Sequence, residues 1–243
     1  MPDMQSAGIE QPGRRSLEEL SFDHRVCFFT GENGTGKSTL LEAIAVHYGF
    51  GREGGTRSFA NDSTESNHSI DPLVKALRLS FDKRTGAGYY LRTESFFNAA
   101  SYIDEIGVTE FYGYKSLHSR SHGETFHILL ELKFQRNGLF LLDEPEAALS
   151  SQRQFSLLVL LNDVHRKHRD PQFIISTHSP ILLGFPDAQI MSFDAEKLQR
   201  IAYDQTVPFT LVKRFLNDSD RFLKKLFNEP SMLFDSPARD QHD

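Results

Sequence analysis

The sequence predicts an α/β protein with a mainly parallel core sheet, because short apolar segments alternate with amphipathic ones along the chain. Residues 25–30, 138–142 and 172–176 are runs of aromatic, β-branched and leucine residues that lack a polar face. Strands that are apolar on both faces are typical of a parallel sheet covered by helices on both sides. Residues 37–48 and 150–167 carry apolar side chains at helical spacing, so we expect them to form two of these helices.

Length and composition are those of an ordinary globular protein. The 243 residues carry 27 Lys and Arg against 33 Asp and Glu, so the net charge of −6 gives no global positive field that would attract nucleic acid. The single cysteine, Cys27, lies in an apolar run and is expected to be buried in a reducing compartment. No stretch approaches the roughly 18 uncharged apolar residues of a membrane helix, so we expect a cytoplasmic protein without an integral membrane segment.

The remaining segments complete a single predicted domain over residues 21–228. Residues 1–20 are expected to be a loose lead-in, and residues 229–243 a frayed tail. The polar stretch 51–69 is either a surface insertion or a functional loop, and the pattern does not distinguish the two. Four further segments have a predicted structure: a hairpin-like pair at 77–81 and 89–93, a helical segment over about 95–136, a strand at 189–193, and one or two amphipathic helices within 209–227.

A glycine-rich loop joins the first predicted strand to the first predicted helix. Residues 31–38, GENGTGKS, match the pattern G-x-x-x-x-G-K-[ST] at every fixed position. Gly31, Gly34 and Gly36 would let backbone amides surround a phosphate, and the following helix directs its positive end at the anion. We therefore predict that Lys37 reaches the β and γ phosphates of a nucleotide and that Ser38 is a ligand of Mg²⁺.

Two further strand ends carry polar residues that suit the same ligand. Asp143 and Glu144 close a buried strand, an unfavourable arrangement unless a cation lies there. Asp143 is predicted to hold Mg²⁺, and Glu144 to orient and deprotonate the attacking water. His178 follows the next apolar strand, where a neutral imidazole can hydrogen-bond a γ phosphate or the attacking water.

The segment Ser121-His-Gly-Glu124 has two open interpretations. As Ser-x-x-Glu it is a capping box that begins a helix, and this requires no function. A capped helix start with Gly123 giving close access is also a second anion site. The sequence at this point does not decide between the two.

Taken together, GENGTGKST, SHGE, LFLLDEPEAALS and IISTHSP resemble the Walker A, signature, Walker B with D-loop, and switch-histidine motifs of the ATP-binding cassette (ABC) ATPases. The resemblance covers residues 25–180 and is greatest for small stand-alone bacterial P-loop ATPases related to the SMC and RecF branch. It implies an ABC ATPase-like head with a small antiparallel part, expected near the N-terminus, and a helical subdomain. It also implies a head-to-tail homodimer in which each bound ATP is covered by the signature helix of the other subunit.

The resemblance assigns roles residue by residue. Asp143 and Ser38 correspond to the Mg²⁺ site, Glu144 to the catalytic base, His178 to the γ-phosphate switch, and Ser121 with Gly123 to the signature that acts on the partner's ATP. The nucleotide cradle corresponds to Gly31, Glu32, Asn33, Gly34, Thr35, Gly36, Lys37, Ser38 and Thr39.

Some family positions are altered in this chain. Arg120 and His122 replace the usual leucine and glycine of the signature, and no glutamine occurs between residues 38 and 120, so Glu94 is the substitute for the Q-loop residue. No aromatic residue precedes Phe22 to stack on adenine, which leaves Arg14 or Arg15 for that role. Heptad repeats are absent, so the coiled-coil arms of SMC proteins are not expected.

The predicted activity is Mg²⁺-dependent ATP hydrolysis in an ATP-sandwich dimer, and three uses of it remain open. The first is DNA repair or genome defence, with DNA or an unidentified protein as partner. The second is the ATP-binding subunit of an ABC transporter, which the missing glutamine disfavours. The third is a slow nucleotide-dependent interaction switch. The basic residues of the tail, Lys213, Arg214, Arg221, Lys224 and Lys225, are more typical of a solvated helix face than of a DNA site.

Overall fold

A computed structural model describes residues 19–56, 70–81, 87–93, 130–131, 133–134, 137–167, 171–195 and 197–229 of the chain. Its centre is a six-stranded sheet in the order β2-β3-β4-β1-β5-β6. All neighbouring strands are parallel except β5 and β6, which are antiparallel. The strands are β1 (Val26–Thr30), β2 (Gly88–Arg92), β3 (Gly138–Asp143), β4 (Pro171–Ser176), β5 (Gln189–Ser192) and β6 (Gln199–Ile201).

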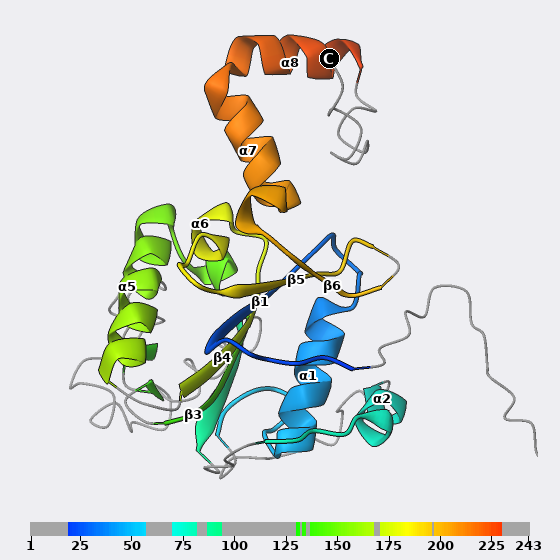
Figure 1. Cartoon of the computed structure of the whole chain (residues 1–243), viewed down its shortest axis with the longest axis vertical. Helices are drawn as coiled ribbons and strands as arrows, with labels where there is room; N and C mark the ends of the chain where they lie inside the picture. The colour runs from blue at the N-terminus through cyan, green and yellow to red at the C-terminus, as the bar shows by residue number, and fades with distance from the viewer. Residues whose placement is uncertain are drawn as a thin grey trace, which may run out of the picture.

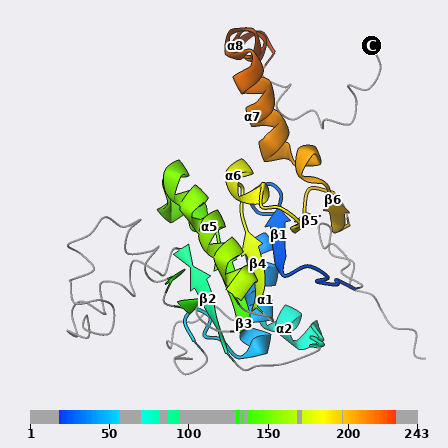
Figure 2. The same ribbon diagram turned by 60° about the vertical axis from the view of Figure 1, so that its left-hand side comes forward.

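Helices cover both faces of this sheet (Figures 1 and 2). One face packs Leu157, Leu161 and Val164 of α5 against strand residues such as Phe140 and Phe173. The other face packs the apolar side of α1 against a second set of strand residues. The helical elements are α1 (Lys37–Tyr48), α2 (Asp71–Ala76), the 3-10 turn η5 (Pro145–Ala148), α5 (Ser151–Lys167), α6 (Pro180–Leu183), the 3-10 turn η6 (Tyr203–Gln205), α7 (Val207–Asn217) and α8 (Ser219–Asn228).

The sequence predictions for the main α/β elements are confirmed. Strands β1, β3, β4 and β5 and helices α1 and α5 lie within a residue or two of their predicted bounds. The expected helix before residue 136 lies largely outside the described residues, although the amide of Phe134 donates to the carbonyl of Leu130 as in a helix. The predicted lead-in, the tail beyond residue 229 and most of the 51–69 loop also lie outside them.

Two local predictions are wrong. Residues 77–81 form no strand, and β2 is not half of a hairpin but a parallel neighbour of β3. The reason is that Tyr90 already has backbone partners on both sides: β3 on one, and Gly55, which exchanges two hydrogen bonds with it, on the other. The small antiparallel part is confirmed, but the strand pair that forms it, β5 and β6, belongs to the second half of the chain.

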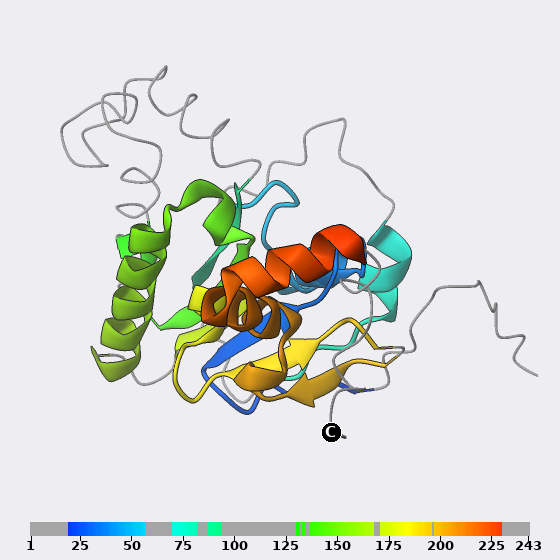
Figure 3. The ribbon, with the colours of Figure 1, turned by 90° about the horizontal axis from the view of Figure 1, so that it is seen from above.

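The last two helices form an arm that leaves the body of the molecule (Figures 1 and 2), and the view from above looks onto α8, which lies across the end of α7 (Figure 3). The amphipathic pattern of residues 209–227 predicted one or two helices here, and the structure has two. Neither helix contains a buried residue, and the rings of Phe215 and Phe222 meet at the elbow between them with centroids 5.9 Å apart. In the described part of the chain, every helix is too short or too polar to cross a bilayer.

Candidate functional site

The predicted site lies along the carboxyl edge of the sheet, where β1, β4 and β3 are adjacent. The glycine loop follows β1, His178 follows β4, and Asp143 ends β3. Strand β4 stands between the other two, so the histidine is placed between the loop and the acidic pair. The carboxyl edge of a parallel sheet is where ligands of such folds bind.

The loop between β1 and α1 adopts conformations that require glycine. Gly34 and Gly36 have φ values of 77° and 96°, which side chains rarely adopt. Gly31 is buried, and a Cβ on it would lie 2.9 Å from the Cβ of Phe193. The amide of Glu32 donates to Asp194 Oδ1 at 2.7 Å, which fixes the loop to the chain that follows β5.

Lys37 closes the loop from within. Its Nζ donates to the carbonyl oxygens of Gly31 at 2.7 Å and Glu32 at 2.8 Å, and the residue is only 4 % exposed. Burial lowers the pKa of this amine, while the nearby carboxylates of Glu144, Asp194 and Asp143 act in the opposite direction. The loop is therefore held in a curved shape, with the unpaired amides of the first turn of α1 behind it.

Ser38 and Asp143 meet across 105 residues of sequence. Ser38 Oγ donates to Asp143 Oδ1 at 2.9 Å, the pair of oxygen ligands that the sequence predicted for Mg²⁺. Burial raises the pKa of the Asp143 carboxyl group, and the hydrogen bond from Ser38 opposes this shift. A hydroxyl and a carboxylate are hard oxygen donors, the type that Mg²⁺ prefers, so these residues fit that cation.

Glu144 has an unusual backbone conformation for a residue other than glycine, with φ 48° and ψ 53°. Its amide donates to the carbonyl of Ser176, and Thr93 Oγ1 lies 3.0 Å from its carbonyl and 2.8 Å from that of Asp143. These contacts, from the last residue of β4 and from the residue that follows β2, hold the peptide in place. A residue in such a conformation persists only where surrounding contacts hold it. Residues of this kind cluster at functional sites.

His178 faces Glu144. The imidazole Nε2 lies 3.6 Å from Glu144 Oε1, beyond hydrogen-bond distance, and it has no hydrogen-bond partner among the described residues although it is enclosed. The position of the ring is set by its backbone, since the amide of His178 donates to Glu146 Oε1 at 2.6 Å. An enclosed ring nitrogen beside a carboxylate is suited to bind a polar group that enters between the two.

The structure also shows residues that the sequence analysis did not single out. These are Thr93, Glu146, Asp194 and Gln154. Gln154 of α5 accepts from Ser179 Oγ at 2.5 Å, and Ser179 accepts in turn from two amides of α6, so the segment after His178 is fixed to α5. Each of these residues is 25 to 162 residues away from its partner in the sequence, so no local sequence pattern predicts the contact.

Other predicted site residues are not placed. Ser121, Gly123, Glu94 and the arginines 14 and 15 all lie outside the described residues. The cradle itself is placed: Gly31 to Gly36 form the loop, and Lys37, Ser38 and Thr39 form the first turn of α1. Its exposed members include Glu32 and Asn33.

The sheet and the phosphate loop define a P-loop nucleotide-binding domain. Residues 116–184 match the family model described as "AAA domain, putative AbiEii toxin, Type IV TA system". The chain is also 26% identical over 218 residues to the thiamine import ATP-binding protein ThiQ of Rhizobium meliloti (strain 1021), covering 89% of this chain and 78% of that protein. Together with the motifs and their geometry, these matches support a P-loop, ABC-like ATPase, as the sequence predicts.

Two solved structures are similar at lower levels of identity. The SMC head domain from Thermotoga maritima is 14% identical, with 75% of this chain and 91% of that chain covered and a TM-score of 0.41. A dimeric bacterial ABC transporter cassette is 15% identical, with 74% and 86% covered and a TM-score of 0.41. The sheet order and the phosphate loop define the nucleotide-binding fold independently of these two structures.

Proposed function

We propose that the protein binds and hydrolyses ATP with Mg²⁺ at the carboxyl edge of the sheet. The observation that carries the proposal is the convergence of three separate segments on one place. Lys37 and Ser38 of the loop, Asp143, Glu144 and His178 come from three adjacent strand ends, with Ser38 2.9 Å from Asp143 and Glu144 3.6 Å from His178.

Each residue of the site has a proposed role that follows from its position. Lys37 and the amides of the loop bind the phosphates of ATP, and Ser38 and Asp143 hold the Mg²⁺. A bound Mg²⁺ supplies positive charge to the phosphate oxygens. Glu144 accepts the proton of the attacking water, and the side chain of His178 donates to or accepts from the same water or the γ phosphate. The contacts of the Glu144 backbone with Ser176 and Thr93 hold the residue in place for this role.

Charges at the site support the proposal. Asp143 and Glu146 have carboxyl groups whose pKa is raised by burial, and Lys37 has an amine whose pKa is lowered by burial. The folded chain therefore holds ionisable groups where their charged forms are disfavoured. Perturbed groups that meet in one place are typical of active sites.

The dimer is the second part of the proposal. We infer that ATP on one subunit is covered by Ser121 and Gly123 of another, as the resemblance to ABC ATPases implies. A Glu144→Gln background should then associate when Mg-ATP is added, as measured by light scattering. Adding Ser121→Asp places a carboxylate opposite the γ phosphate and should abolish that association, whereas Asp is as good a helix N-cap as Ser and leaves the fold intact. Association that persists in the double variant contradicts the signature assignment.

For the process, we propose a cytoplasmic ATPase of DNA repair or genome defence. The matched family, whose description names a toxin of a Type IV TA system, supports genome defence. The ThiQ relative supports the alternative, an ATP-binding subunit of a transporter, and slow turnover would favour an interaction switch. Salt-sensitive stimulation of turnover by DNA would favour the first, and co-purification with an integral membrane protein the second.

The direct test is release of phosphate from ATP by the purified full-length protein. We expect turnover that requires Mg²⁺ and stops when a chelator removes it. Measured binding of ATP without any turnover would support the interaction switch, and absence of both binding and turnover would refute the proposed function.

A further inference from the structure

Glu146 connects the segment that carries Glu144 to the segment that carries His178. It lies in the 3-10 turn η5, two residues after Glu144, and its Oε1 accepts the amide of His178 at 2.6 Å. The amide of Ala147 donates to the carbonyl of Glu144, which closes the turn. A carboxylate makes a stronger hydrogen bond to an amide than a neutral acceptor does. Through this one side chain, His178 is attached to the turn that begins at Glu144.

These contacts form a closed path around the place proposed for the attacking water. The path follows the backbone from Glu144 to Glu146 and crosses the Glu146 side chain to the amide of His178. It returns through the imidazole, whose Nε2 lies 3.6 Å from Glu144 Oε1. Nε2 is enclosed and has no hydrogen-bond partner among the described residues. The gap between imidazole and carboxylate therefore depends on the hydrogen bond of Glu146.

The residues on either side of His178 have anchors of their own. The amide of Thr177 donates to a carbonyl of β1, and Ser179 Oγ donates to Gln154 Oε1 in α5. Loss of the Glu146 contact should therefore leave the end of β4 in place and release only the peptide that carries the imidazole. A misplacement of about 1 Å can lower a rate by roughly 10²-fold, even when the substituted residue is away from the chemistry.

The carboxylate of Glu146 is poorly placed for stability alone. Its second oxygen, Oε2, is enclosed and has no hydrogen-bond partner in the described part of the chain. An enclosed acceptor without a partner lowers the free energy of unfolding. A stabilising role therefore does not account for this side chain, whereas a role in the position of His178 does.

We propose that Glu146 is a positioning residue for ATP hydrolysis, which holds the imidazole of His178 at a fixed distance from the carboxylate of Glu144. The assignment rests on the proposed function, because Glu146 acts through the two residues that are placed there as the base and as the γ-phosphate contact. It requires no contact between Glu146 and the nucleotide.

Turnover and ATP titration of the full-length protein test the proposal. Glu146→Ala removes the acceptor and should lower kcat roughly tenfold, with little change in ATP affinity because the phosphate loop is unaltered. Glu146→Gln keeps an acceptor for the amide, so its turnover should remain close to that of the wild type. In a His178→Ala background, Glu146→Ala should lower turnover by less than about twofold, since the group that it positions is gone.

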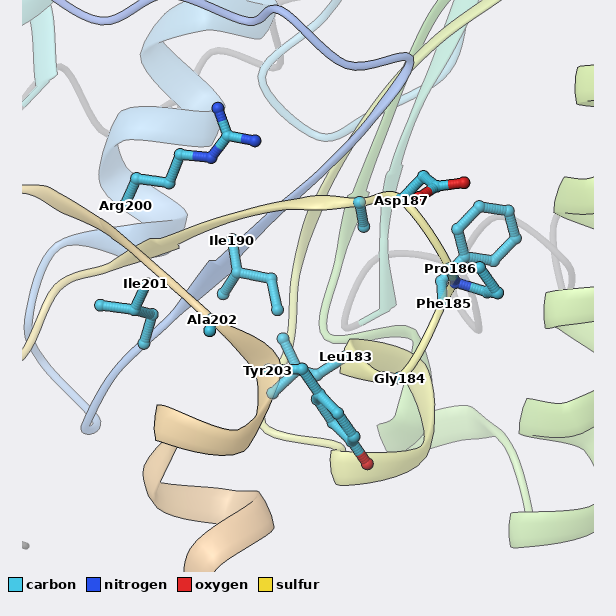
Figure 4. Close-up of a pocket in the computed structure, with 11 residues that line it drawn as sticks. Leu183, Gly184, Phe185, Pro186, Asp187, Ile190, Arg200, Ile201, Ala202 and Tyr203 are labelled. Carbon is cyan, nitrogen blue, oxygen red and sulfur yellow. The ribbon is translucent and has the colours of Figure 1, made fainter.

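Tyr203→Phe is the matched control. The Tyr203 hydroxyl donates to the carbonyl of Pro180 at 2.8 Å, so this substitution also removes one hydrogen bond to the segment after β4. Tyr203 lines the pocket between α6 and the β5–β6 pair, and Figure 4 shows its hydroxyl beside α6. The substitution leaves the amide of His178 bonded to Glu146, so turnover should equal that of the wild type.

Histidine ring signals in NMR spectra test the position of His178 without ATP. In protein with isotope-labelled histidine, the signal of His178 is identified by its loss in His178→Ala. It should shift in Glu146→Ala and remain near its wild-type position in Glu146→Gln and Tyr203→Phe. This measurement needs no turnover, so it decides the role of Glu146 even if the protein binds ATP without hydrolysing it. Failure of the proposed function is thereby distinguished from failure of this assignment.

Four results would overturn the proposal. The first is an unchanged His178 signal in Glu146→Ala. The second is a fall in turnover on Glu146→Ala that is equal with and without the His178 side chain. The others are a Glu146→Gln variant as slow as Glu146→Ala, and a Tyr203→Phe variant as slow as Glu146→Ala. Thermal unfolding of each variant ensures that every measurement is made on folded protein.

Discussion

The two edges of the sheet differ in the groups that destabilise the isolated chain: enclosed polar groups at one edge, and exposed apolar groups at the other. At the carboxyl edge, ionisable and polar groups are enclosed: Asp143 is 8 % exposed, and Thr30 Oγ1 and Glu146 Oε2 have no hydrogen-bond partner among the described residues. At the amino edge and on the arm that begins there, Leu216 and Phe227 are exposed to water. Both arrangements lower the free energy of unfolding of the isolated chain. At the carboxyl edge polar groups lose their contact with water, and on the arm apolar side chains remain in contact with it.

The comparison teaches that an unfavourable arrangement also indicates the chemistry of its partner. Enclosed carboxylates beside a lysine-closed loop suit a cation with phosphates, and exposed apolar side chains on the arm suit another protein surface. Substitutions at the carboxyl edge should therefore change ligand binding and turnover, while substitutions on the arm should change association alone.

Lys37→Ala has the largest expected effect. It removes the side-chain cation that is proposed to bind the phosphates and both hydrogen bonds that hold the loop curved, so ATP binding should be lost. Calorimetric titration with Mg-ATP measures this. The exposed Lys213→Ala on the arm is the control and should bind ATP as the wild type does. Unchanged affinity in Lys37→Ala would refute the phosphate-loop assignment.

Glu144→Gln should retain Mg-ATP binding and lower turnover by roughly 10² or more, the scale of losing a general base. The amide keeps the shape of the side chain but cannot accept the proton. Steady-state phosphate release gives turnover, and titration gives binding, so the two effects separate. Glu229→Gln, a change at an exposed position beyond α8, should alter neither quantity. Turnover near that of the wild type would assign the base elsewhere.

The carboxyl edge could be predicted from sequence because its motifs are local. The spacing of the glycines predicts the loop. The acidic pair and His178 each lie at the end of an apolar strand, and because such strands are expected to be parallel, their carboxyl ends lie at the same edge of the sheet. The sequence could not show that β4 lies between β1 and β3, which is what brings His178 to Glu144, because strand order depends on pairing between distant segments.

The errors and omissions have the same origin. The predicted hairpin failed because Gly55, not residues 77–81, pairs with Tyr90, and Gly88 and Gly138 allow β2 and β3 to approach so closely that a Cβ on Gly88 would lie 2.0 Å from the carbonyl oxygen of Leu139. The arm helices were predicted from periodicity, but their exposure was not. A periodic pattern shows which face of a helix is apolar, and it does not show what covers that face.

Thr93→Val should have a smaller effect than either substitution above. The hydroxyl of Thr93 is buried and lies within hydrogen-bond distance of the carbonyls of Asp143 and Glu144, so its removal leaves those carbonyls with one donor fewer and loosens the strained peptide. We expect a loss of about 1 to 2 kcal/mol in the free energy of unfolding and a severalfold fall in turnover. Chemical denaturation measures the first. The control is Thr210→Val. The Thr210 hydroxyl donates to the carbonyl of Val207 within the arm helix α7, so its removal should lower the free energy of unfolding by less.

Glu146→Gln has the smallest expected effect, and it should raise the free energy of unfolding rather than lower it. Burial raises the pKa of the Glu146 carboxyl group in the folded state, with the hydrogen bond from the amide of His178 acting in the opposite direction. The folded chain thus binds the proton of this group more tightly than the unfolded chain does. Ionisation consequently destabilises the fold at pH values above the raised pKa, and the penalty disappears once the pH falls below the ordinary carboxyl value.

Glutamine resembles the protonated acid and can still accept from the amide of His178, so Glu146→Gln should unfold at a higher temperature than the wild type at pH 8. A difference on the order of 2 to 4 °C corresponds to about 1 kcal/mol in a chain of this size. The difference should narrow as the pH is lowered through the raised pKa of Glu146, and the exposed Glu19→Gln should show no such trend. A variant that is less stable at pH 8 would mean that the hydrogen bond to His178 outweighs the burial of charge. The carboxyl edge would then be stabilised by its acidic residues, and the contrast between the two edges would not hold.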